Sequence, residues 1–591
     1  MAHGAVSYKI MDLRGLNRAA SGTLYPLLLA LLIGLLAGVG AILFRTMILL
    51  GEDILWPAGN FLPEHMANAS WQWRLCVPAL VGLLIGPIIS FVAPELRGPG
   101  VPEVMKALAL NHGRIRHRVT ILKAFVTALL ISSGASVGRE GPIVQIGSSL
   151  GSSLTQILRL GHMERRLAVA CGAAAGIAAT FQAPMAGTLF AVEILLFDLE
   201  VASLSNIVIA AVTGTVVSRM WWGQGAVFNV PEFELVHPAE LGIYLVLGIL
   251  AGIISFILIK TIFFLPRLWD KTPVPLWLRP AFAGLIIGCL GLVFPQALGV
   301  GYESVDQALA SRIALVMAMT LLVAKVAATS ICIGSGMSGG IFAPSLFAGA
   351  MLGVLTGDIA QMIWPDVGLS PGHYALVGMG AVVSGTTLAP ITAILTIFEL
   401  TYTYQVILPL MVACIPSLMI VRFFHGLSIY ETKLLNEGIQ IVRGHEVNRL
   451  RNMTVKDFMT KDLQILHEET PFEQIVTLME QSAFPHFVVL DNRDRLRGIL
   501  TLRDLRGLLA NPHSVSEGLV ARDIMKKQPI TLTEDDNLET AFHLFAKHGF
   551  AFLPVVKSKD PKKVVGQIKK TDLIAAYDQQ VLKEHILRRQ P

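Results

Sequence analysis

The chain has 591 residues, of which 53% are hydrophobic, and its mean hydropathy of +0.62 excludes an ordinary soluble globular protein. Its length predicts more than one domain. The net charge is only +5, and basic and acidic residues interleave in the charged C-terminal part, which argues against a nucleic-acid partner.

Charge divides the chain near residue 440. Residues 441–591 hold 43 of the 89 Asp, Glu, Lys and Arg residues, whereas the first 440 residues hold 46. We therefore expect a membrane part followed by a soluble tail. The expected organisation is an N-terminal segment at 1–24, a transmembrane part at 25–440, a linker at 441–452, and tail units at 453–510 and 519–580.

The first apolar stretch, at about 25–43, is long enough to span a bilayer and is followed by no small-residue cleavage site. Lys9, Arg14 and Arg18 precede it, which predicts a cytoplasmic N-terminus, and we expect the tail on the same side. Further apolar segments continue to residue 424, and several are short or interrupted by glycine and proline. Such helices are tolerated only inside protein or beside a polar cavity, so we expect an all-α polytopic bundle.

An internal repeat divides the transmembrane part into halves at about 25–220 and 240–425. A shift of 202 residues aligns Gly134, Ser136, Gly138, Pro142, Gly147 and Gly151 with Gly336, Ser338, Gly340, Pro344, Gly349 and Gly353. A shift of 206 residues aligns six identities between 172–193 and 378–399. Interruptions at matching places in two halves indicate a transport site.

Three loops and one tyrosine form the candidate site. They contain Gly98, Pro99 and Gly100; Gly138, Arg139, Glu140, Gly141 and Pro142; Gly340, Ile341, Phe342, Ala343 and Pro344; and Tyr430. Glycines before a helix let backbone N–H groups converge, and a helix N-terminus favours an anion. Glu140 can occupy such a site when charged and leave it when protonated, as a gate and a proton carrier. The alternative is a helix-end charge paired with Arg139.

The repeat pairs Glu140 with Phe342, which adds no competing charge. We therefore expect the N–H groups of Ile341 and Phe342 to bind an anion without a full positive charge, which would hold it too tightly for rapid passage. The hydroxyl of Tyr430 could donate to the same anion, although a tyrosine at this place is often an interfacial anchor.

The tail contains a second repeat. Val455–Met459 resembles Ala521–Met525, and Phe487–Val489 has a counterpart in Pro554–Val556. Each unit is expected to combine helices with short apolar strands.

The transmembrane motifs together resemble the CLC family of chloride channels and chloride/proton exchangers. The resemblance implies a homodimer in a bacterial-type plasma (inner) membrane, with one pore in each subunit and two inverted halves. It implies bound chloride ions, held by the N–H groups of Ile341 and Phe342 and by Tyr430. Glu140 corresponds to the family's external gating glutamate. Voltage gating and proton exchange are both known in the family, and the residues leave exchanger and channel open.

Two positions depart from the family pattern. Pro99 stands where a serine usually donates a hydrogen bond to the anion, and proline offers neither hydroxyl nor N–H. Family members that prefer nitrate resemble this chain there, so we expect nitrate to be accepted. Ile194 occupies the position where proton-coupled family members have an internal proton-transfer glutamate. Glu193 is one residue before it. One residue is about 100° around a helix, so Glu193 does not simply replace it. It is expected as a structural helix-end carboxylate.

The tail resembles a pair of CBS domains, an α/β regulatory module in which an aspartate can hold a nucleotide ribose. Thr501 and Asp504 fit that pattern, whereas the second unit keeps Asp572 and has Lys569 at the threonine position. Adenine-nucleotide binding is therefore expected at Thr501 and Asp504 and not at Asp572. The alternative is that the two CBS domains have a purely structural role.

Other classes of function fit less well. A membrane-anchored CBS nucleotide sensor would not need polar loops within the membrane. A different CBS-bearing ion transporter, such as a magnesium carrier, would need converging carboxylates that the membrane part lacks. No metal, nucleophile or phosphate-loop motif indicates an enzyme.

Overall fold

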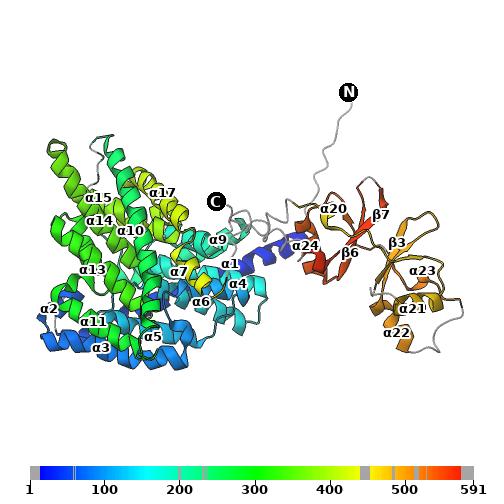
Figure 1. The fold of residues 1–591 in the computed structure, drawn as a ribbon, viewed down its shortest axis with the longest axis horizontal. Helices are drawn as coiled ribbons and strands as arrows, with labels where there is room; N and C mark the ends of the chain where they lie inside the picture. The colour runs from blue at the N-terminus through cyan, green and yellow to red at the C-terminus, as the bar shows by residue number, and fades with distance from the viewer. Residues whose placement is uncertain are drawn as a thin grey trace. The chain divides into compact units, whose positions relative to one another are not determined.

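A computed structural model of the chain describes residues 13–57, 59, 61–196, 201–228, 230, 233, 235, 237–439, 453–481, 486–510, 518–527, 529–558 and 560–573. Its contacts divide the chain into two compact units on either side of residue 441. The first unit is built from helices and the second from strands with short helices (Figure 1). The expected linker at 441–452 and the first twelve residues of the N-terminal segment lie outside the described residues.

The helical unit consists of two runs of helices in the same order. The first run is α1 (Leu13–Leu55), α2 (Leu62–Asn68), α3 (Trp71–Pro87), α4 (Val101–Leu110), α5 (Arg118–Ser132), α6 (Glu140–Ile157), α7 (His162–Phe181), α8 (Pro184–Phe190) and α9 (Val201–Trp222). The second is α10 (Glu240–Trp269), α11 (Arg279–Val293), α12 (Tyr302–Leu309), α13 (Leu315–Gly334), α14 (Phe342–Ile363), α15 (Pro371–Thr387), α16 (Pro390–Thr401), α17 (Ile407–Phe424) and α18 (Ile429–Asn436). Short 3-10 or π turns are η1 (Ile88–Val92), η2 (Pro94–Leu96), η3 (Ala191–Leu196), η4 (Pro295–Ala297), η5 (Pro365–Val367) and η6 (Tyr404–Val406).

Seven helical segments in the described chain are long and apolar enough to cross a membrane. Their large hydrophobic side chains remain exposed, as on α1, α10 and α17. Exposed apolar surface of this extent suits lipid rather than water. The chain is therefore an integral membrane protein, as predicted.

Two of the apolar segments are broken at matching places, as the glycine and proline interruptions in the sequence predict. Gln182 adopts φ 54° between α7 and α8, and Leu388 adopts φ 54° between α15 and α16. Pro184 and Pro390 begin the next helices, because proline lacks an N–H and disfavours helix in the preceding residue. The breaks confirm that short helices, buried in protein, build each half.

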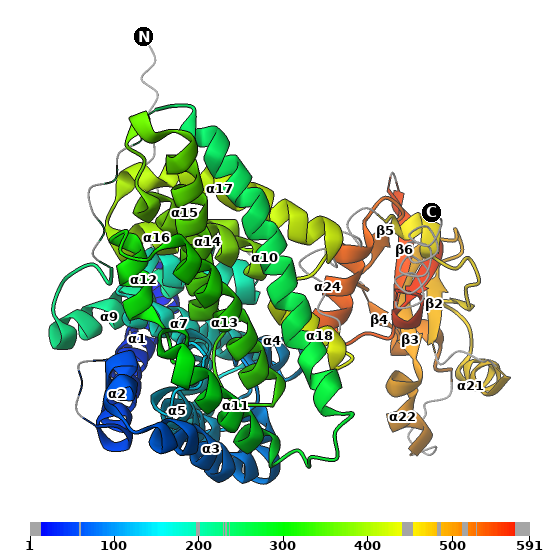
Figure 2. The ribbon, with the colours of Figure 1, turned by 60° about the vertical axis from the view of Figure 1, so that its left-hand side comes forward.

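The two halves also pack together through glycine. A Cβ atom on Gly82 of α3 would collide with the carbonyl oxygen of Pro280, and one on Gly284 of α11 would collide with that of Pro78. The contact is reciprocal, as expected when equivalent helices meet at a pseudo-symmetry axis. Figure 2 shows α10 lying along α13 and α14, which it contacts.

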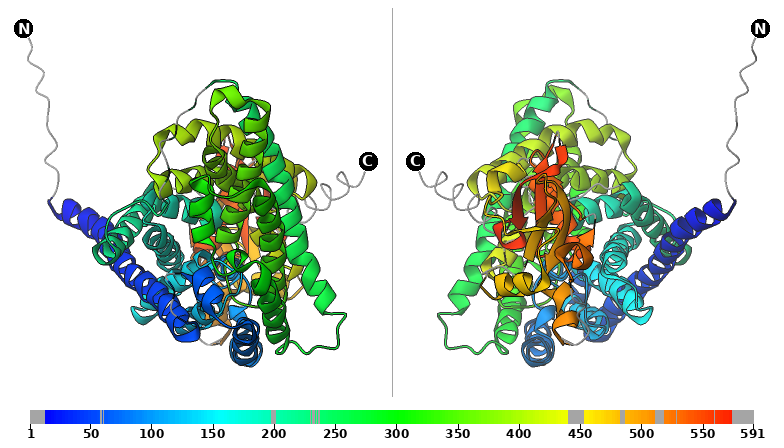
Figure 3. Two further views of the ribbon diagram at one scale, coloured as in Figure 1. Left: turned by 90° about the vertical axis from the view of Figure 1, so that its left-hand side faces the viewer. Right: turned by 90° about the vertical axis from the view of Figure 1, so that its right-hand side faces the viewer.

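The first helix starts earlier than the apolar stretch that marks it. α1 begins at Leu13, so part of the expected N-terminal segment is helical. Its first turns (blue) extend beyond the other helices of the helical unit (Figure 3).

The tail contains two small sheets. Its strands are β1 (Ile465–His467), β2 (His486–Leu490), β3 (Leu496–Thr501) and β4 (Lys526–Lys527) in one sheet, and β5 (Leu532–Thr533), β6 (Phe552–Lys557) and β7 (Asp560–Lys569) in the other. Its helices are α20 (Val455–Phe458), α21 (Phe472–Gln481), α22 (Leu502–Ala510), α23 (Ala521–Ile524) and α24 (Leu538–His548). In each sheet the first two strands are parallel and the next pair is antiparallel. The predicted α/β tail is confirmed.

The two tail units exchange their leading segments. Val455 of α20 packs in the core of the second sheet, whereas Ala521 of α23 packs in the core of the first. His486 stacks on Phe552 at 3.7 Å and shares a hydrogen bond of 2.9 Å with Gln567, and burial lowers its pKa. The tail units therefore fold as one interlocked pair.

Candidate functional site

The three predicted loops meet through their backbones. Gly138 and Gly340 exchange two hydrogen bonds of 2.7 and 2.6 Å across the pseudo-symmetry axis. The N–H of Gly98 donates to the carbonyl of Met337, and its own carbonyl accepts from Gly339, both at 3.2 Å. These bonds fix the relative positions of the starts of α4, α6 and α14.

Glycine is required where the loops approach most closely. A Cβ atom on Gly141 would collide with the carbonyl oxygen of Pro99 and lie 3.1 Å from the Cα of Gly340. Gly98 and Gly100, with φ of 77° and 86°, adopt the left-handed region that glycine accommodates. The small residues predicted for these loops therefore have a steric reason.

Glu140 is the first residue of α6 and is 1% exposed. One carboxylate oxygen accepts the N–H of Ala343 at 3.3 Å, and the other accepts the hydroxyl of Tyr302 at 2.6 Å. Ala343 lies in the first turn of α14, where backbone N–H groups have no partner within the helix. The Glu140 carboxylate thus accepts a hydrogen bond from the start of α14.

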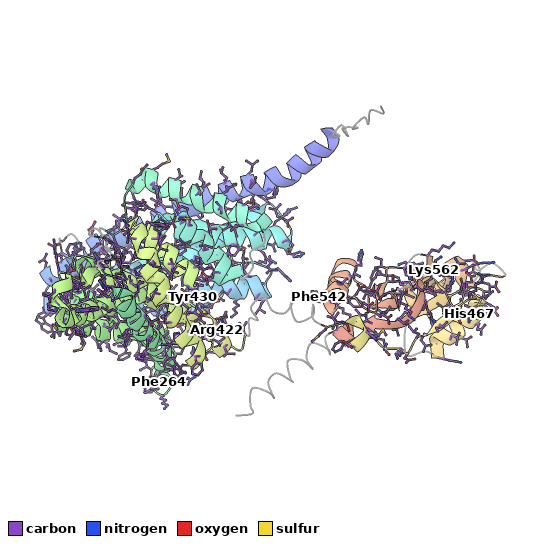
Figure 4. The ribbon with its side chains drawn as sticks, turned by 90° about the horizontal axis from the view of Figure 1, so that it is seen from above. Phe264, Arg422, Tyr430, His467, Phe542 and Lys562 are labelled. Atoms are coloured by element: carbon purple, nitrogen blue, oxygen red, sulfur yellow. The ribbon has the colours of Figure 1, made fainter. Side chains whose placement is uncertain are left out.

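The other predicted anion ligands lie around the same helix start. Ile341 is the N-cap of α14, Phe342 is its first residue, and both are buried. Tyr430 in the first turn of α18 is 2% exposed and interacts electrostatically with Glu140. Figure 4 labels Tyr430 among the helices and Phe264 at the margin of the helical unit. Tyr430 is too deeply buried to be an interfacial anchor.

Cavities on two sides of the described helical unit reach residues of the loops. A cavity of about 380 Å³ is lined by Arg139 and Tyr302, which flank Glu140. Another of about 490 Å³ is lined by Pro99 and Ile341. Arg139 and Tyr302 therefore lie between Glu140 and one cavity, and the other cavity reaches the loops at a different place.

Two buried lysines hold the loops, although the sequence reasoning did not select them. The ammonium group of Lys123 donates to the carbonyls of Leu96 and Gly98 at 2.9 and 3.1 Å. Lys325 donates to the carbonyls of Ala297, Gly299 and Val300 at 2.9–3.2 Å. The shift of 202 residues that revealed the repeat also aligns Lys123 with Lys325, so the signal was present in the sequence.

Tyr302 was also not among the site residues predicted from the sequence. It begins α12, which matches α4 in the repeat, and Gly301 before it has φ 87° as Gly100 does before α4. The segment 299–301 was not recognised as the counterpart of 98–100 because only its two glycines match.

Glu193 and Glu399 each accept hydrogen bonds from the start of a helix in the other half of the repeat. Glu193 accepts the N–H and hydroxyl of Thr392 at 2.8 and 2.6 Å, at the start of α16. Glu399 accepts the N–H of Ala186 at 2.7 Å, at the start of α8. Ile194 is 3% exposed. Both carboxylates thus have helix N-terminal N–H groups as partners, the arrangement expected of structural helix-end groups.

In the tail, each predicted aspartate accepts a hydrogen bond from the residue three positions before it. Asp504 accepts the N–H and hydroxyl of Thr501 at 2.9 and 2.6 Å. Asp572 accepts the N–H of Lys569 at 3.0 Å, and the lysine has no hydroxyl to add to that bond. The two places therefore differ, as the sequence suggests. The metal-binding residues Asp, Glu, His and Cys form no cluster of three within the described ranges.

Comparison with known proteins agrees with this architecture. Residues 81–422 match the family described as voltage gated chloride channel, and residues 455–511 and 521–579 each match the CBS domain. The chain is 37% identical over 414 residues to a putative chloride channel protein ClcB-like of Ralstonia nicotianae, covering 69% of this chain and 96% of that protein. It is 31% identical over 421 residues to the H(+)/Cl(-) exchange transporter ClcA of Klebsiella pneumoniae, covering 69% and 88%.

Solved structures show the same fold. A slow cyanobacterial Cl-/H+ antiporter aligns with a TM-score of 0.64 and 27% identity, over 70% of this chain and 97% of that one. A eukaryotic CLC transporter aligns with a TM-score of 0.62 and 20% identity, over 93% and 98%. The chain therefore belongs to the voltage-gated chloride channel (CLC) family and carries a pair of CBS domains after its transmembrane part.

Proposed function

We propose that the protein moves chloride, or a similar monovalent anion, past Glu140 and exchanges it for protons. The observation that carries the proposal is the hydrogen bond between the Glu140 carboxylate and the N–H of Ala343. When charged, Glu140 occupies the start of α14 and blocks it. When protonated, it leaves, and the N–H groups of Ile341 and Phe342, with the hydroxyl of Tyr430, bind the anion.

Proton coupling is supported by relatives described as H(+)/Cl(-) exchange transporters and by the buried carboxylate of Glu140. A second function, passive conduction of the anion, is favoured by one observation. Ile194 cannot carry a proton, and Glu193 beside it is engaged as a helix cap.

Anion transport itself is tested by chloride release from liposomes that contain the full chain. We expect release that scales with the amount of protein and is negligible in protein-free liposomes. Failure to release chloride across acidic and neutral pH would favour the membrane-anchored sensor instead.

Replacing Pro99 by serine is expected to shift the ratio of nitrate to chloride flux toward chloride by about fivefold. A serine hydroxyl adds one hydrogen bond to the anion, which contributes about 1 kcal/mol. The measurement is release of each anion from liposomes. Pro238→Ser, in the exposed loop before α10, is the matched control and should keep the original ratio. An unchanged ratio for Pro99→Ser would remove Pro99 as the cause of nitrate acceptance.

The remaining parts of the proposal follow from family membership. We propose a homodimer in a bacterial-type plasma membrane, with both termini cytoplasmic and the domain boundaries predicted above. We also propose that the tail binds one adenine nucleotide, at Asp504, because the carboxylate there is supported by the Thr501 hydroxyl and its counterpart at Asp572 is not.

A further inference from the structure

We propose that Tyr302 is a positioning residue, which holds the ionised carboxylate of Glu140 at the start of α14 and so sets the pH at which the pathway opens. The inference rests on the proposed gating role of Glu140. It adds to that role a group from the other half of the repeat.

The hydrogen bond between these residues is short. The Tyr302 hydroxyl lies 2.6 Å from one oxygen of Glu140, and the N–H of Ala343 lies 3.3 Å from the other. Among the described residues, Tyr302 alone contributes a side-chain hydrogen bond to this carboxylate. A hydrogen bond to a charged acceptor is stronger than one to a neutral acceptor, so it favours the ionised form.

The position of Tyr302 is fixed from several sides. Its ring meets Phe228 edge-on at 5.2 Å, and the guanidinium of Arg139 lies 5.0 Å from its centroid. Lys325 binds the carbonyls of the loop that precedes α12. A Cβ atom on Gly301 would lie 2.7 Å from the ring of Phe347 and 3.1 Å from the ammonium of Lys325, so this turn is tightly packed. The hydroxyl is therefore presented by a rigid support.

The repeat shows that this support serves Glu140 alone. In the other half, Lys123 binds the carbonyls of the matching loop, and Gly100 makes the matching turn. Val101 then stands at the place of Tyr302, and Phe342 at the place of Glu140. The hydroxyl is thus present only where there is a carboxylate to receive it.

Other charged and titratable groups lie near Glu140. They influence its protonation in the wild-type protein and in Tyr302→Phe alike. Arg139 is the neighbour of Glu140 in the chain, and Lys325 on α13 and Tyr430 on α18 interact with it electrostatically. Arg45 and Glu52 on α1 and Glu303 on α12 line the cavity that Arg139 and Tyr302 border. Replacing Tyr302 by phenylalanine leaves all of them in place and removes one hydroxyl. A change in the pH profile of that variant therefore reports on the hydroxyl.

The experiment compares chloride flux against pH for the full chain in liposomes. Tyr302→Phe should raise the pH of half-maximal flux by about one unit, a tenfold change in proton concentration. Tyr244→Phe removes a buried hydroxyl on α10 that has no hydrogen-bond partner among the described residues, and it should keep the wild-type midpoint. In a Glu140→Gln background, Tyr302→Phe should have no effect on the pH profile. A wild-type midpoint in Tyr302→Phe, or an equal effect in both backgrounds, would overturn the proposal.

A spectroscopic reading separates this proposal from the proposed function. The infrared band of the protonated Glu140 carboxyl is identified by its loss in Glu140→Gln, and its titration needs no flux. A higher titration midpoint in Tyr302→Phe supports the positioning role even if the liposomes release no chloride, which would count against transport alone. An unchanged midpoint counts against Tyr302 whatever the flux.

Discussion

Glu140→Gln is expected to carry chloride at a rate that no longer falls as the pH rises. Glutamine has nearly the shape of the protonated carboxyl but cannot ionise, so it does not compete as an anion for the start of α14. Flux should vary by no more than about twofold between about pH 4.5 and about pH 7.5, a range over which an ordinary glutamate changes from partly protonated to fully ionised. The wild-type protein should lose most of its flux over that range. The measurement is chloride release from liposomes at fixed protein content.

The control for this variant is Glu164→Gln, which removes an exposed carboxylate from the first turn of α7. It should keep the wild-type pH profile. If Glu140→Gln retains the steep pH dependence, the carboxylate is not the gate, and the bond to Ala343 has only a structural role.

Gly141→Ala is expected to reduce chloride flux by at least about tenfold and to lower the midpoint of thermal unfolding. The added methyl group would collide with the carbonyl oxygen of Pro99, where the three loops meet. Inserting a methyl group into packed structure typically costs about 1–3 kcal/mol, and relief would require moving α6. Such a movement displaces Glu140, the residue before it. Flux and thermal unfolding are measured on the same purified protein.

Gly242→Ala is the matched control for this substitution. Gly242 lies in α10, and a Cβ atom there would meet nothing within 4 Å. Alanine is the better helix former, so this variant should be at least as stable as the wild-type protein. Wild-type flux and stability in Gly141→Ala would contradict the close packing of the loops.

Much of the membrane architecture could be predicted from the sequence, because each half repeats the other. The breaks at Pro184 and Pro390, and the loops at 138 and 340, are written into the chain as glycine and proline. The closest contacts of Glu140 could not be predicted in the same way. Tyr302 lies 162 residues away along the chain, and only the folded structure brings its hydroxyl to the carboxylate.

The partners of Glu193 show a second limit of the sequence. Sequence spacing showed that this carboxylate is not at the position of Ile194, but it did not reveal what it binds. The structure pairs it with the start of α16 in the other half, and Glu399 with the start of α8. Contacts that cross between repeats cannot be read from either repeat alone.

The central claim, that Glu140 couples an anion to a proton, is tested most directly by recording chloride and proton movement together. Liposomes containing the full chain are given an outward chloride gradient and no proton gradient. We predict that chloride leaving the liposomes drives protons inward, against the gradient that they create, and that Glu140→Gln passes chloride without moving protons. Sustained chloride flux with no proton movement in the wild-type protein, or proton movement that survives in Glu140→Gln, would contradict the account.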